Sequence, residues 1–136
     1  MPVFFHSGRD ARYINFYNFR DLQERDLFRR VSRFVLLGEK KEGQSFFLIA
    51  VTGAKMQQLN RQYRQENRVT DVLSFAGEEP GYLGEVILCR EQARQNAREY
   101  NWPLQKELTR LVIHGLLHLL GYEHEKGGRR EKEMMK

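Results

Sequence analysis

The chain has little of what marks secreted and membrane proteins. It has a single cysteine, Cys89, so it cannot form an internal disulfide, whereas small secreted domains usually depend on disulfides. Its longest apolar run, around residues 111–120, is interrupted by histidines and is too short to cross a bilayer. The first ten residues contain no basic segment followed by an apolar core, so no signal peptide is expected. These absences predict a cytoplasmic protein without membrane segments.

The chain also lacks internal repeats, low-complexity tracts and Pro/Gly-rich linkers. A length of 136 residues is typical of one domain with one core, so a single domain is expected over residues 1–136. Apolar content of 40% and charged content of 30% are those of an ordinary globular protein.

Positive charge is in modest excess, with 23 Lys and Arg against 18 Asp and Glu, and 16 of the 23 are arginine. A guanidinium matches phosphate oxygens with two parallel donors, which an ammonium cannot do. The composition is therefore compatible with a polyanionic partner such as nucleic acid, although a solvated surface with ordinary charge bias explains it equally simply. Two predicted helices have arginines four residues apart on one face: Arg25, Arg29 and Arg33 on one, Arg90, Arg94 and Arg98 on the other.

Hydrophobic periodicity predicts an α+β fold. Apolar residues at helical spacing, with Thr52 and Gly121 as candidate end signals, predict helices over 21–37, 54–64, 90–100 and 103–120. Short runs rich in apolar and β-branched residues predict strands over 3–7, 45–51, 69–75 and 82–89. We expect the helices to pack on a mixed sheet of about four strands.

The stretch HGLLHLLGYEH, residues 114–124, carries the strongest chemical signal. His114 and His118 are four residues apart, so their rings project from one face of a helix. Gly121 permits the chain to turn back and bring His124 round as a third ligand. Three imidazoles with an open fourth position are typical of a catalytic zinc site. The alternative is that these histidines are ordinary core residues.

Gly115 stands where a zinc peptidase carries the glutamate that accepts a proton from the metal-bound water. Peptidase chemistry is therefore disfavoured. Phosphodiester cleavage depends more on stabilising negative charge, for which a nearby arginine is suited. Candidates for that arginine, and carboxylates that could act as a base, are Arg61, Arg64, Arg68, Asp71 and Glu85. Each of them could equally be a solvated surface residue.

Three blocks together resemble the YbeY family of endoribonucleases: LNRQYRQENRVTDVLSF (59–75), LGEVILC (83–89) and HGLLHLLGYEH (114–124). The resemblance implies a zinc-dependent, single-strand-specific endoribonuclease that matures the 3′ end of 16S ribosomal RNA and acts in ribosome quality control. It implies one Zn²⁺ per chain held by His114, His118 and His124, with Arg64 as the important arginine. The implied fold is similar to the zinc-peptidase scaffold.

The partners implied by the resemblance are RNA, specifically 16S ribosomal RNA, and ribosomal particles. Two alternatives stay open from the residues themselves. One is a metal-dependent hydrolase of another substrate class, including a peptidase. The other is a non-catalytic ribosome-binding factor in which zinc is structural.

Overall fold

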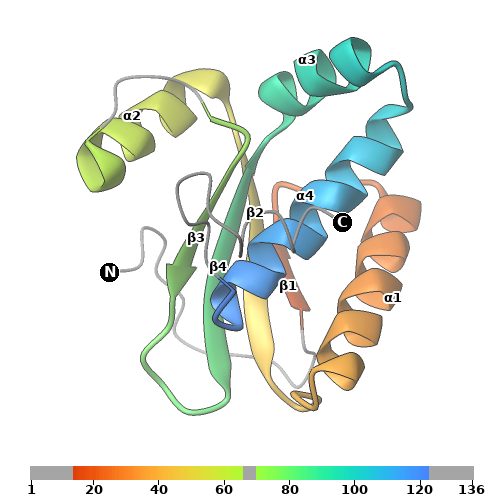
Figure 1. Ribbon diagram of the computed structural model, residues 1–136, viewed down its shortest axis with the longest axis vertical. Helices are drawn as coiled ribbons and strands as arrows, with labels where there is room; N and C mark the ends of the chain where they lie inside the picture. The colour runs from red at the N-terminus through yellow and green to blue at the C-terminus, as the bar shows by residue number, and fades with distance from the viewer. Residues whose placement is uncertain (1–13, 66–69, 123–136) are drawn as a thin grey trace.

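The computed structural model describes residues 14–65 and 70–122. In chain order the elements are β1 (Ile14–Tyr17), α1 (Leu22–Gly38), β2 (Ser45–Val51), α2 (Gly53–Arg64), β3 (Val72–Ala76), β4 (Tyr82–Cys89), α3 (Arg90–Tyr100) and α4 (Leu104–Leu119). Within these described residues, four helices pack on a mixed four-stranded sheet, which confirms the predicted α+β class (Figure 1). Within these two ranges no helix is long and apolar enough to span a bilayer.

The strand order is β1-β2-β4-β3. Strands β1, β2 and β4 run parallel, and β3 pairs antiparallel with β4 at one edge. The chain segment before β1, which contains the strand predicted over 3–7, lies outside the described residues. Strand β1 was not predicted, because a four-residue strand that starts at Ile14 has too few residues to show a clear alternation. Strand β3 begins at Val72, three residues later than expected.

Both faces of the sheet are buried, which explains why β2 and β4 read as continuous apolar runs. Alternate residues of each strand point to opposite faces. Phe46, Leu48, Val86 and Leu88 pack in one core cluster with α1 and α4. Ile49 and Ile87 pack in the other with Met56 and Leu59 of α2. Helices α1 and α4 therefore cover one face of the sheet and α2 covers the other (Figure 1).

The helix ends follow the local chemistry of the sequence. Asp21 caps α1, and its side chain accepts hydrogen bonds from the backbone of Gln23 and Glu24. Thr52 caps α2 through its hydroxyl, as predicted, at 3.2 Å from the Lys55 nitrogen. Helix α1 ends at Gly38, one residue beyond the expected end at 37, and Lys40, at φ 60°, takes the left-handed conformation.

Candidate functional site

Helix α4 carries the histidine pair. It begins after Pro103 and packs against β3, β4 and α1. Its buried side is formed by Leu108, Leu111, Val112, Gly115 and Leu116. His114 and His118 are partly exposed at the margin of that side, one helical turn apart. Two imidazoles on one face of an apolar helix are the arrangement expected for two ligands of one metal ion.

The chain turns back directly after α4. Gly121 has a φ of +107°, which an L side chain rarely adopts. Its nitrogen donates to the His118 carbonyl at 3.1 Å, and the Tyr122 nitrogen donates to the Leu117 carbonyl at 3.0 Å. This turn is the one predicted from the sequence. The third predicted ligand, His124, lies outside the described residues, and no third His, Cys, Asp or Glu completes a metal-ligand group within 14–65 and 70–122.

Gly115 lies where α4 comes closest to the sheet. A β-carbon at this position would stand 2.5 Å from Val86 Cγ1 and 3.3 Å from both Ser74 Oγ and Val72 Cγ2. The Ser74 hydroxyl also donates to the Gly115 carbonyl at 3.0 Å, which holds helix and strand at this separation. The residue after His114 therefore points into the core rather than toward a metal. A glutamate there has no room, and so a peptidase-type base is absent from this position.

Arg64 is the last residue of α2 and is exposed. Arg61, one turn earlier, is exposed too, and Arg68 lies outside the described residues. Within the described ranges no hydrogen bond or ion pair joins Arg64 to either histidine. Helix α2 lies on the opposite face of the sheet from α4 (Figure 1). The structure thus brings His114 and His118 together and leaves Arg64 on a separate element.

Of the two carboxylates considered as bases, Glu85 is buried and Asp71 is partly exposed. Glu85 is nearly fully buried, and strand alternation places it opposite Val86, on the α2 face of the sheet. It accepts a hydrogen bond from the Tyr82 hydroxyl at 3.4 Å. Asp71 precedes β3 and accepts from the Asn96 amide at 3.0 Å. Because Glu85 is buried, it is not accessible as a base to a substrate beside the histidines.

A buried polar network around Glu107 was not predicted. Glu107 is fully buried on α4 and accepts from Trp102 Nε1 at 3.1 Å, Arg110 Nη2 at 2.7 Å and Asn96 Nδ2 at 3.0 Å. Burial by itself raises the pKa of the Glu107 carboxyl, but the hydrogen bonds from Arg110 and Asn96 outweigh it and lower that pKa. The only feature of the sequence that indicated this network was the spacing of three residues between Glu107 and Arg110. The network ties α3 and the start of β3 to the helix that carries the histidines.

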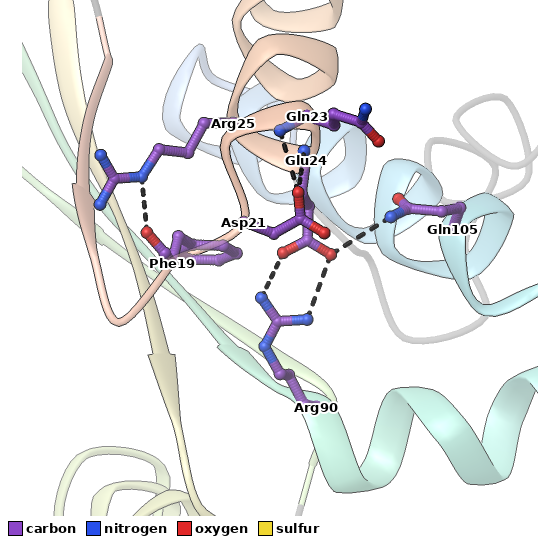
Figure 2. Close-up of polar contacts among 7 residues, drawn as sticks. All are labelled: Phe19, Asp21, Gln23, Glu24, Arg25, Arg90 and Gln105. Carbon is purple, nitrogen blue, oxygen red and sulfur yellow. Dashed lines mark hydrogen bonds and ion pairs between the residues drawn. The ribbon is translucent and has the colours of Figure 1, made fainter.

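On each of the two predicted arginine faces, fewer arginines are available to a ligand than the sequence suggested. The two terminal nitrogens of Arg90, Nη1 and Nη2, donate to the Glu24 carboxylate at 3.2 and 2.5 Å, and Gln105 donates to the same group at 3.3 Å (Figure 2). Arg90 also lies over the Phe19 ring. Because its charge is neutralised by Glu24, Arg90 does not belong to a phosphate-binding face. Arg94 and Arg98 stay exposed on α3.

On α1, too, two of the three predicted arginines make contacts within the protein. Arg25 donates to the Phe19 carbonyl (Figure 2), and both Arg25 and Arg29 lie over the Phe16 ring. Arg29 also pairs with Asp26 at 3.2 Å. Of the three arginines predicted to share this face, Arg33 alone is exposed.

Comparison with known proteins assigns the chain to a family. The sequence model of the family described as Endoribonuclease YbeY matches residues 14–136. The protein named Endoribonuclease YbeY of Aquifex aeolicus is 47% identical over 83 residues, which are 58% of this chain and 55% of that protein. The one of Syntrophotalea carbinolica is 37% identical over 113 residues, 78% of this chain and 75% of that protein. The chain thus matches only part of the length of these relatives.

A solved structure is similar over most of the chain. The solution structure of TM1509 from Thermotoga maritima is 33% identical and superimposes with a TM-score of 0.63, covering 90% of this chain and 81% of that one. The family match extends over the histidine helix, the turn at Gly121 and the β3–β4 pair that holds Gly115. The chain belongs to the YbeY family.

Proposed function

We propose that the chain is a metal-dependent endoribonuclease that cleaves single-stranded RNA in the cytoplasm. The observation that carries the proposal is the pair His114 and His118, one turn apart and partly exposed on α4, in a chain of the YbeY family. The finer proposal is that the substrate is 16S ribosomal RNA in ribosomal particles, that the 3′ end is matured there, and that this serves ribosome quality control. Its support is the resemblance of the three sequence blocks to that family.

His114, His118 and His124 would hold one Zn²⁺ per chain. The donor set fits: two imidazoles share one face of an apolar helix, and the chain turns at the left-handed Gly121, where the Tyr122 nitrogen donates back to the Leu117 carbonyl. When bound, the ion supplies a Lewis acid and a water that ionises near neutral pH. No ligand in this set carries negative charge, so the site favours an anionic substrate more than a carboxylate-rich site would.

The protein residues have separate tasks in this proposal. Gly115 allows the helix that carries the two histidines, α4, to lie close on β3 and β4. Arg64 would stabilise the negative charge that develops on the phosphoryl oxygens. Because its side chain is exposed at the end of α2, it is accessible to a strand bound across the molecular surface.

Two rival functions make different predictions. A hydrolase of another class, a peptidase above all, would have to supply its base from elsewhere than position 115. A ribosome-binding factor with structural zinc would need the histidines for folding rather than for catalysis.

The test uses the purified chain with single-stranded RNA, duplex RNA and an unstructured peptide, alongside the double variant His114→Ala/His118→Ala. Thr109→Ala/Ile113→Ala, two partly exposed positions with the same spacing on α4, is the matched control. We expect cleavage of single-stranded RNA only. The histidine variant should stay folded, with its zinc and its cleavage lost, while the control keeps both. Peptide cleavage would favour the first rival. A histidine variant that unfolds, together with a folded wild type that cleaves no RNA, would favour the second.

A further inference from the structure

An open hollow of about 790 Å³ lies at the corner where α3 meets α4. Its lining residues are Arg94, Ala97, Arg98, Asn101, Trp102, Pro103 and Leu104. Two of these are cationic, one is a large aromatic, and none is a carboxylate. A hollow of this composition is complementary to an anionic ligand that also has a flat apolar part.

The two arginines are available to such a ligand. Arg94 and Arg98 are exposed and lie one turn apart on α3, with Cβ atoms about 5–6 Å from each other. In the part of the chain that the structure describes, neither side chain makes a hydrogen bond or an ion pair. Arg90, one turn earlier, differs because Glu24 neutralises it. Lys106 is not part of the lining, but its Nζ lies beside Trp102, 4.5 Å from the centre of the ring.

Trp102 is held in place without a ligand. Its indole N–H donates to the buried Glu107 at 3.1 Å, and its ring centre lies 4.9 Å from that of Tyr100. Because these contacts already fix the ring, little side-chain entropy is lost when a base packs against it. Aromatic side chains beside cations are the usual means by which proteins hold single strands without sequence preference.

We propose that the hollow at the α3–α4 corner is a second contact site for single-stranded RNA, in which Arg94 and Arg98 bind phosphates and Trp102 contacts a base. The inference rests on the proposed function, since RNA is the anion it assigns. The hollow lies at the start of α4, ten residues before His114, which is about 15 Å along the helix. It therefore binds a part of the strand that lies several nucleotides away from the bond that is cleaved.

Tryptophan fluorescence monitors this site directly because Trp102 is the single tryptophan of the chain. We would titrate a single strand of about twenty nucleotides, longer than the roughly 4–16 nucleotides that a small domain contacts. Chelator is present to prevent cleavage, and Trp102 fluorescence and anisotropy of a labelled RNA are followed together. The test variant is Arg94→Glu/Arg98→Glu. The matched control is Arg30→Glu/Arg33→Glu, which reverses two exposed arginines on α1.

We expect Trp102 fluorescence to change with the same midpoint as RNA anisotropy. The test variant should bind about tenfold or more weakly, and the slope of log affinity against log salt should fall by roughly 1.4, because each phosphate contact on a single strand contributes about 0.7. The control should change little. Arg94→Gln/Arg98→Gln, with its melting temperature measured, provides the same test if charge reversal disturbs the fold.

The proposal fails if Trp102 fluorescence does not respond while anisotropy shows binding, or if the test variant binds like the control. In either case wild-type cleavage of RNA leaves the proposed function intact. If the wild type neither binds nor cleaves RNA, the proposed function fails and the hollow has no role as an RNA site. The length of the RNA provides a further test. The test variant should cleave a trinucleotide, which is too short to reach the hollow, at the wild-type rate, and it should cleave the long strand with a raised KM.

Discussion

At Gly115 the separation of α4 from the sheet leaves no room for a β-carbon. Gly115→Ala would bring a methyl group within 2.5 Å of Val86 Cγ1, so helix and strand must move apart. We expect a loss of about 1–3 kcal/mol in the free energy of unfolding, which is typical of overpacking a core. Chemical denaturation measures it. Gly38→Ala is the control, because nothing lies within 4 Å of its added carbon, and it should be neutral or slightly stabilising. Equal effects at the two positions would contradict the packing explanation.

Arg64 is the residue on which the proposed charge stabilisation depends. Arg64→Ala should stay folded, keep its zinc and still bind RNA, with single-turnover cleavage slower by about a hundredfold to a thousandfold, as for loss of one transition-state donor. Arg64→Lys should rescue only partly, because an ammonium lacks the two-pronged geometry. Arg61→Ala, exposed on the same helix, is the control. Cleavage by Arg64→Ala at the parent rate would show that the assignment is wrong; weak binding with a normal saturated rate would make Arg64 a phosphate anchor instead.

At the scale of elements, two polar links hold the histidine helix against the rest of the fold. One is the Glu107 network, in which hydrogen bonds lower the pKa of the carboxyl from its ordinary value of 4.5. A carboxyl with a lowered folded-state pKa contributes stability above its unfolded-state pKa, and this contribution disappears as the pH falls through the folded-state value. We expect the free energy of unfolding to decrease as the pH falls below about 4.5. Glu107→Gln should lack that part of the decrease and be less stable at neutral pH by about 1–3 kcal/mol. Parallel pH profiles for the two proteins would contradict a stabilising role of the charged form.

The other link joins α1, α3 and α4 through Glu24 and Arg90 (Figure 2). The Glu24 side chain is only 7% exposed, so removing its partner leaves a desolvated carboxylate. Arg90→Met should destabilise the protein by about 1–3 kcal/mol, and Glu24→Gln should reduce that cost when the two changes are combined. A double-mutant cycle in urea measures the coupling. The exposed pair of Arg29 and Asp26 is the control, with an expected coupling of about 0.2–1 kcal/mol. Equal coupling in the two pairs would contradict the importance of burial.

These links also show where inference from the sequence stops. The helices that carry the histidines and Arg94 were predicted within a residue or two, because helical spacing and an end signal such as Gly121 are local features of the sequence. Glu24 and Arg90 are 66 residues apart, and nothing local indicates that they meet. The use of Arg90 inside the protein was therefore missed, and it appeared in the sequence as part of a free arginine face.

At the scale of the whole molecule, the α+β class and the four-stranded sheet were predictable because β2 and β4 are buried on both faces and show it in their composition. Strand β1 was not, since its place in the sheet depends on pairing with β2 rather than on its own four residues. For the site, spacing alone paired His114 with His118, whereas the reason for Gly115 needed the position of Val86 on another element. The hollow at Trp102 likewise arises only when α3 and α4 meet.

We propose that this chain cleaves single-stranded RNA with a metal held by three histidines. The most direct measurement is single-turnover cleavage of one labelled single strand by the purified chain as isolated, after chelation, and after zinc is returned, with zinc content and melting temperature measured on each sample. We expect about one zinc per chain as isolated, loss of cleavage on chelation while the protein stays folded, and recovery when zinc is restored. Cleavage that continues unchanged in the metal-free, folded protein would contradict the account.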